Sequence, residues 1–296
     1  MPGVLVMPGQ EVEDAAMQTI ETQILLPFEE KNLRGGYRDY FVAKRTNYFA
    51  TIHTFARLWN CYLGLDEIWE REFSDLQRIT QPGQALPIKL FSNCHAQFRI
   101  AFELGFSTCI GEAWNIVRSS IETAVQAHKI WREPKLALVW AKKGDGPQEQ
   151  KAYQAAFESH KKESLFPVEH GLRELYTYYG DYSELGTHST ISALALRHNI
   201  EVDDKDVSWR HEYLETKPVR MASFLSTILT ACALVEKAFF DCFDSRLKLD
   251  TDLMRMREVF AVQKRQTAEW ILKEFKFDQY RADLEKQIAL GSSVIP

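Results

Sequence analysis

The sequence predicts an all-α protein, an antiparallel helical bundle with additional helices at its N- and C-terminal ends. Three observations support this fold class. Apolar residues recur at alternating steps of three and four, Gly and Pro residues separate the segments that carry this pattern, and no internal repeat is present. With 296 residues, of which 45% are apolar, the chain can bury a sizeable core.

The N-terminal region is expected to contribute little to the bundle. Residues 1–10 lack a basic stretch followed by a long apolar run, so we expect a loose arm and no signal peptide. Residues 11–296 would then form one helical domain with its core at about 88–245. A first helix over residues 12–27 ends at a proline, and the pair Gly35-Gly36 is expected to form a loose joint.

The central helices follow an aromatic-rich segment. Residues 37–79 are expected to form two helices bent near Gly64 and Asp66, and residues 82–87, with two prolines, a loop. A first central helix then ends at Gly105, and Ser107 or Thr108 is expected to cap the second. The second helix carries one apolar stripe, formed by Ile110, Trp114, Val117, Ile121, Ala124, His128 and Trp131.

Shorter elements are expected after the break at Glu133-Pro134. They are a short helix to residue 143, a linker over 144–147, helices over 148–162 and 168–179, and a helix from Asp181 or Ser183 to residue 196. The charged insertion 197–218 has no helical period and could form a hairpin or an extended loop. An apolar helix over 219–246 and a charged helix over 252–290 close the chain.

Composition excludes several functional classes. The apolar run beginning at Met221 has about 15 residues, fewer than the roughly 20 that cross a bilayer, so we expect a central bundle helix and no membrane partner. A net charge of −5 provides no overall attraction for nucleic acid. Five cysteines without Cys-x-x-Cys pairs indicate reduced thiols in a cytoplasmic protein, and we expect no metal and no cofactor.

Two sets of polar residues are candidates for a binding site. Arg118 and Glu122 lie one turn apart at the margin of the apolar stripe, and we expect them in an interhelical contact. Asp181, Glu184 and His188 share a second helical face. They could ligate a divalent metal, but a solvated acidic face near a helix N-terminus explains them more simply.

The segments FRIAFELGF, EAWNIVRSSIETAVQAHKIWREPKLALVW and LYTYYGDYSELGTHS resemble a group of uncharacterised prokaryotic proteins with a HEPN-like helical core, over residues 91–196. This resemblance implies an antiparallel bundle, and such bundles commonly form homodimers. HEPN ribonucleases place a His a few residues after an Arg. Here Arg118 and His128 are too far apart, and Arg197-His198 and Arg210-His211 are adjacent, which counts against RNA cleavage at such a motif.

These observations lead to three functional hypotheses. The first is a HEPN-like helical module that serves either in interaction or in sensing a nucleotide or RNA, with Arg118, Glu122, Asp181, Glu184 and His188 as ligand-binding residues. The second is a ribonuclease in which Arg118 and His188, as catalytic candidates on different helices, face one another. The third is a carboxylate/His metalloenzyme. The sequence leaves open whether the protein is an enzyme.

Overall fold

The computed structural model describes residues 34–76, 82–186, 198–202, 207–211, 213–279, 281–282 and 285. The chain divides into two compact units, residues 1–46 and 47–296. The arm predicted for residues 1–10 and the helix predicted for residues 12–27 lie outside the described ranges. Helices dominate the described part, which confirms the helical fold class, and one two-stranded antiparallel hairpin accompanies them.

The aromatic-rich segment forms α2 (Gly35–Thr54) and α3 (Ala56–Asp75), which meet at Phe55. The bend predicted near Gly64 and Asp66 is therefore wrong, since both residues lie inside α3. Phe55 leaves helical geometry instead, at φ −107° and ψ 36°, and its side chain is buried. A helix interior tolerates one glycine at a cost of about 1 kcal/mol, which tertiary packing can offset. The joint predicted at Gly35-Gly36 is also wrong, because these residues begin α2.

The central pair consists of α4 (Pro82–Phe106) and α5 (Ile110–Arg132), and the stripe predicted on α5 lies against the core. The loop prediction for residues 82–87 is wrong, since α4 includes all of them. Pro82 is the first helical residue, where its missing N–H costs nothing, and Pro87 lies inside the helix. The predicted cap at Ser107 or Thr108 is also wrong. Cys109 precedes α5 without a side-chain cap, while the Thr108 hydroxyl accepts a hydrogen bond from Asn47 Nδ2 at 2.9 Å.

The helices in the middle of the chain differ from the prediction in two ways: one predicted helix is interrupted, and a later one continues through its predicted start. The helix predicted over 148–162 is interrupted at Ser159 and at His160, which has φ +48°. Asp181 and Ser183 do not begin a helix, because the tyrosine-rich helix runs through them. The elements are α6 (Leu136–Ala141), α7 (Pro147–Tyr153), the π-helix η2 (Gln154–Glu158), α8 (Lys161–Leu165), the 3-10 helix η3 (Glu169–Gly171) and α9 (Leu172–Gly186).

Of the two structures that the sequence allowed for the insertion at 197–218, a hairpin or an extended loop, the structure contains the hairpin. Its strands are β1 (His198–Val202) and β2 (Val207–His211), which pair antiparallel with Ile200 opposite Trp209. The chain continues through α11 (Pro218–Phe243) and the 3-10 turn η4 (Asp244–Arg246). It then forms α12 (Thr251–Glu274), which ends earlier than predicted because Phe275 is extended, at φ −109° and ψ 132°.

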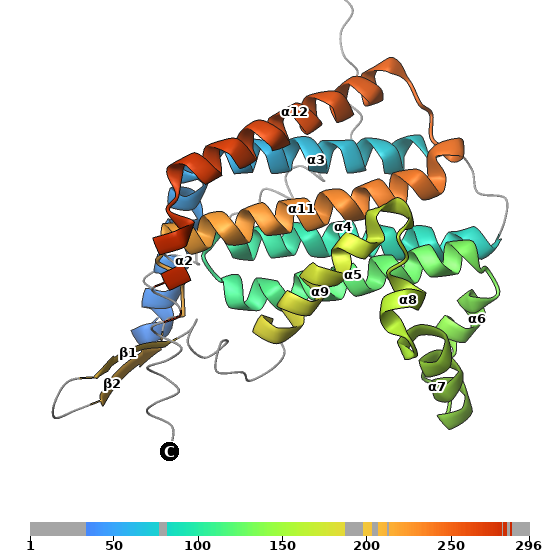
Figure 1. Ribbon diagram of the computed structural model, residues 1–296, viewed down its shortest axis with the longest axis horizontal. Coiled ribbons are helices and arrows are strands. Elements are labelled where there is room, and N and C mark those ends of the chain that lie inside the picture. The colour runs from blue at the N-terminus through green and yellow to red at the C-terminus, as the bar shows by residue number, and fades with distance from the viewer. Residues whose placement is uncertain are drawn as a thin grey trace, which may run out of the picture. The chain divides into compact units, whose positions relative to one another are not determined.

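The core lies where α11 packs against α3, α4, α5 and α9. Figure 1 shows α12 alongside α3, and α4 alongside α5. By length and composition, Pro218–Arg246 is the one stretch of the described residues that could span a membrane, and 56% of its most apolar window is buried in the protein. The central helix of a bundle has the same length and composition.

Candidate functional site

Arg118 and Glu122 lie on α5, one turn apart, beside the buried stripe. Their side chains are 28% and 26% exposed, so each retains contact with solvent. An Arg at such a margin can bury its stem on the core and direct its guanidinium to a neighbouring helix. Both residues contact a second helix, as expected for an interhelical contact.

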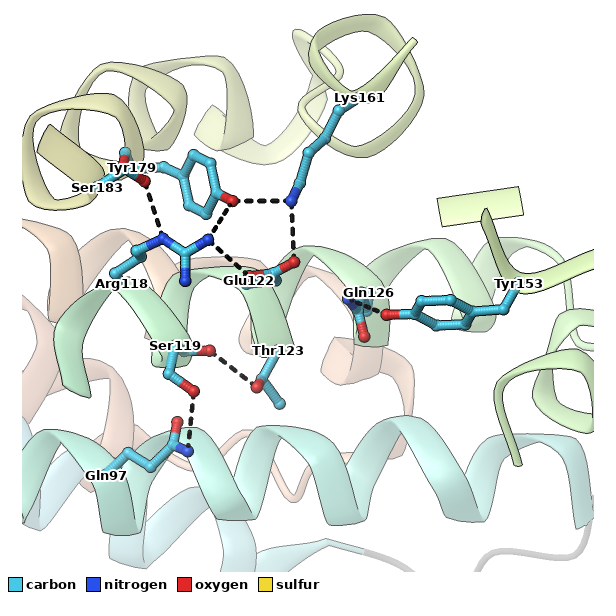
Figure 2. A network of polar contacts seen from close by, with 10 residues as sticks. All are labelled: Gln97, Arg118, Ser119, Glu122, Thr123, Gln126, Tyr153, Lys161, Tyr179 and Ser183. Atoms are coloured by element: carbon cyan, nitrogen blue, oxygen red, sulfur yellow. Dashed lines mark hydrogen bonds and ion pairs between the residues drawn. The ribbon is translucent and has the colours of Figure 1, made fainter. Parts of the chain in front are cut away.

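The guanidinium of Arg118 joins α5 to α9 (Figure 2). Its Nε donates to the Ser183 hydroxyl at 2.8 Å, and its Nη2 donates to the Tyr179 hydroxyl at 2.9 Å. The Ser183 hydroxyl donates in turn to the backbone carbonyl of Tyr179 at 2.6 Å. Tyr179 and Ser183 are one turn apart on α9, so a single helical face receives the whole guanidinium edge.

Glu122 pairs mainly with Lys161, which was not predicted from the sequence as a site residue. Its Oε1 accepts from Lys161 Nζ at 2.8 Å, whereas its Oε2 lies 3.6 Å from Arg118 Nη2. Lys161, the first residue of α8, also donates to the Tyr179 hydroxyl at 2.8 Å. We call Arg118, Glu122, Lys161, Tyr179 and Ser183 the Arg118 network; it joins α5, α8 and α9 (Figure 2).

The electrostatics of the network keep its lysine charged. Burial lowers the pKa of Lys161, but hydrogen bonds to Glu122 and Tyr179 outweigh burial and leave the pKa above its ordinary value. The Arg118 guanidinium carbon and Lys161 Nζ also lie 5.0 and 4.6 Å from the centre of the Tyr179 ring. A ring within about 6 Å of a cation attracts it through the negative charge on its face. Two cations therefore converge on one tyrosine.

Further polar contacts extend from α5 on either side of this network (Figure 2). Gln126 donates to the Tyr153 hydroxyl at 3.0 Å and accepts from the Trp140 indole at 2.8 Å. Gln97 of α4 donates to the Ser119 hydroxyl at 3.4 Å. Because their partners lie on α4, α6 and α7, these contacts hold α5 in register with its neighbours.

The other predicted site residues do not join the network in the described structure. Asp181 and Glu184 lie on α9 with exposed side chains, and no hydrogen bond or ion pair within the described residues links either one to Arg118. Partial desolvation on the side that faces the protein, and then the neighbouring Glu184, raise the pKa of the Asp181 carboxyl. His188 lies outside the described residues, so its pairing with Arg118 stays a prediction.

No group of three or more His, Cys, Asp or Glu residues within the described ranges is arranged to hold a metal ion. The metal ligand set of Asp181, Glu184 and His188 includes one residue outside those ranges, and it also stays a prediction.

Sequence reasoning missed Lys161, Tyr179 and Ser183. The one usable signal was the i, i+4 spacing of Tyr179 and Ser183, which places a phenol and a hydroxyl on one helical face. Nothing in the local sequence marks Lys161, because its neighbours in the network lie 18 and 39 residues away.

Comparison with known proteins adds no family to this description. The chain matches no protein-family model, no curated protein and no solved structure.

Proposed function

We propose that this protein is a helical binding module for a phosphate-bearing ligand, a nucleotide or RNA, with Arg118 and Lys161 as its phosphate contacts. The observation that carries the proposal is the convergence of these two cations, from different helices, on the hydroxyl of Tyr179. Their side chains are 28% and 24% exposed, so a ligand can reach them from solvent.

The charge and donor inventory supports an anionic ligand. Two cations and one carboxylate leave the Arg118 network with one net positive charge. Nη1 of Arg118 has no hydrogen-bond partner within the described residues, and Figure 2 shows it without a dashed line. Tyr179 accepts two hydrogen bonds and keeps its own hydroxyl hydrogen, and Lys161 uses two of its three hydrogens. Three donor groups therefore remain for phosphate oxygens: Nη1 of Arg118, the Tyr179 hydroxyl and Nζ of Lys161.

Glu122 occupies the place of the anion in this arrangement. Its carboxylate takes one hydrogen bond from Lys161 and lies near Arg118, as a phosphate would. Charge-assisted bonds from Arg and Lys bind carboxylates and phosphates with similar geometry. A bound phosphate would compete with Glu122, so this residue is expected to limit affinity.

The proposal is binding and includes no bond-breaking step, because no hydrogen bond or ion pair of the described residues brings an imidazole into the network. We also propose that the helices form a HEPN-like bundle. Two features support this: a three-residue connection joins α4 to α5, and α9 packs on α5.

The proposal also includes a homodimer, supported by exposed apolar side chains along α12: Met254, Val259, Val262 and Leu272. Sedimentation at micromolar concentration should give twice the mass of one chain. A monomer mass would contradict this part.

The binding test uses ATP and a short single-stranded RNA, titrated by calorimetry and by fluorescence anisotropy. Arg118→Gln and Lys161→Gln should each weaken binding roughly tenfold or more, because a charge-assisted hydrogen bond is lost. Glu122→Gln should strengthen it by removing the competing carboxylate. Arg255→Gln is the matched control, since it removes one positive charge at a side chain that is 72% exposed on α12.

Thermal unfolding of each variant separates lost binding from lost folding. No binding of either probe to the wild-type protein, or binding that Arg118→Gln and Lys161→Gln leave unchanged, would overturn the proposal. His188→Ala tests the remaining prediction: binding that is unchanged by this substitution removes His188 from the site.

A further inference from the structure

We propose that the groove between α3 and α12 is a second binding site, and that its ligand is an uncharged saccharide. The groove is a cavity of about 820 Å³, and every described residue that lines it belongs to one of these two helices. This volume falls in the range of roughly 300–1,000 Å³ that holds small molecules in proteins. The site is independent of the Arg118 network, which lies on α5, α8 and α9.

The charges that line the groove cancel. Arg57 and Lys273 contribute two positive charges, and Glu269 and Glu274 contribute two negative charges. A site that selects an anion or a cation carries an excess of the opposite charge. The balance here favours a ligand without net charge, which separates this site from a phosphate site.

The uncharged part of the lining is rich in carboxamides. Asn60 on α3 and Gln263 and Gln266 on α12 all face the groove. A carboxamide both donates and accepts hydrogen bonds through groups that lie side by side. A sugar hydroxyl likewise donates one hydrogen bond and accepts others, so three carboxamides match a ligand with several hydroxyl groups.

One aromatic ring completes the groove. Trp270 is half-buried and is held edge to face by Phe275, at 5.8 Å between ring centres. Phe275 in turn stacks on the buried Phe55 at 5.6 Å. The guanidinium of Arg57 lies over the Trp270 ring, 5.4 Å from its centre, so a ligand that stacks on this face takes the place of the cation. Trp270 is thus a supported apolar surface at the edge of a polar cavity, and one face of a pyranose ring is made of C–H groups that pack on such a surface.

The lining distinguishes a saccharide from a nucleobase. A base is apolar on both faces and polar only at its edge, so it calls for two apolar walls. Among the described residues that line the groove, Cys61 is the one apolar residue besides Trp270, and it is 1% exposed. Burial raises the pKa of the Cys61 thiol to about 11, so the thiol stays protonated and takes no part in covalent chemistry. Binding is therefore non-covalent, through hydroxyl groups and a single stacked face.

The test measures binding of four neutral sugars, glucose, galactose, mannose and N-acetylglucosamine, by ligand-observed NMR and calorimetry on the full chain. We expect at least one to bind saturably, and inorganic phosphate not to displace it. Gln266→Ala should weaken binding by roughly tenfold, because hydrogen bonds to the sugar are lost. Trp270→Phe should also weaken binding, because the ring on which the sugar packs is smaller. Gln150→Ala, at an exposed position of α7 outside the groove, is the matched control and should bind like wild type.

Trp270→Phe keeps an aromatic ring against Phe275, so the fold should persist, and thermal unfolding checks this for every variant. Three outcomes would each overturn the proposal. None of the four sugars binds, the bound sugar is displaced by phosphate, or binding is unaffected by both Gln266→Ala and Trp270→Phe. Since Arg118 takes no part in this groove, Arg118→Gln should leave sugar binding unchanged.

Discussion

Glu72 on α3 and Glu236 on α11 are two buried carboxyl groups that meet at one nitrogen, Nη1 of Arg257 on α12. Glu72 is fully buried, and the Glu236 side chain is 5% exposed. One guanidinium cannot neutralise two carboxylates, so one of the pair is expected to hold a proton. Burial and the neighbouring Glu236 raise the pKa of Glu72 far above its ordinary value. Protonated Glu72 can then donate to Glu236.

The first prediction concerns the pH dependence of stability. The folded chain keeps a proton on Glu72 that the unfolded chain releases above its ordinary pKa of about 4.3. The folded state thus binds more protons, and its stability falls as pH rises above that value. Glu72→Gln removes the titration while keeping the hydrogen bonds. The free energy of unfolding at about pH 8 should rise by about 1–3 kcal/mol, as measured by urea denaturation.

Glu70→Gln is the control, because Glu70 lies on the same helix with a side chain that is 59% exposed. Its effect should stay within about 0.5 kcal/mol at every pH. A Glu72→Gln variant that is less stable than wild type at about pH 9 would show that Glu72 is an ionised, stabilising partner of Arg257.

The second prediction concerns the Glu122–Lys161 pair. The two side chains are 26% and 24% exposed, so they are only partly desolvated. A double-mutant cycle with Glu122→Gln and Lys161→Met should give a coupling free energy of about 1–2 kcal/mol. The Asp252–Arg255 pair, with side chains 73% and 72% exposed, should give about 0.5 kcal/mol or less. Equal coupling in the two pairs would contradict the interhelical role assigned to Glu122.

The third prediction concerns acid sensitivity at His128. This residue is 1% exposed, and its Nε2 has no hydrogen-bond partner among the residues that the structure describes. Burial, and then the neighbouring side chains of His170 and Arg132, lower the pKa of His128 to about 4. An unfolded histidine titrates at about 6.5, so the unfolded chain binds more protons below that pH. Stability should therefore fall as pH decreases from about 6.5 to about 4, by up to roughly 3 kcal/mol from this residue.

His128→Leu should flatten that decrease, measured as the free energy of unfolding at about pH 7 and about pH 4.5. His53→Leu, at an exposed position of α2, should leave the slope as in wild type. NMR titration of the His128 ring gives an independent reading, and a midpoint near 6.5 would disprove the depressed pKa.

The fourth prediction concerns two helical glycines. A Cβ added at Gly105 would lie 2.7 Å from Cε1 of the buried Phe224, so α4 and α11 approach closely there. Gly105→Ala should destabilise the protein by about 1–3 kcal/mol despite its better helix propensity. At Gly180 on α9 no atom lies within 4 Å of an added Cβ. Gly180→Ala should instead stabilise by about 0.5–1 kcal/mol. Thermal unfolding of both variants tests this prediction, and equal changes in melting temperature would rule out the close contact at Gly105.

The local pattern of the sequence determined the helices and their buried faces. The stripe from Ile110 to Ile121 and beyond on α5 lies in the core as its spacing predicted, because apolar residues on one side of a helix have to be removed from water. The apolar helix beginning at Pro218 and the charged helix after Asp250 were predicted for the same reason. These properties depend on neighbours within a few turns.

Tertiary structure decided the breaks and the partners. Helix continuity through Gly64, and again through Asp181 and Ser183, follows from packing that outweighs small local preferences. The sequence predicted Arg118 and Glu122 as a pair, yet Lys161, 39 residues from Glu122, is the closer partner, and Tyr179 joins both cations. Such contacts depend on how α5, α8 and α9 meet in space. Spacing along one helix predicts which residues share a face, but it contains no information about which distant side chain will lie opposite that face.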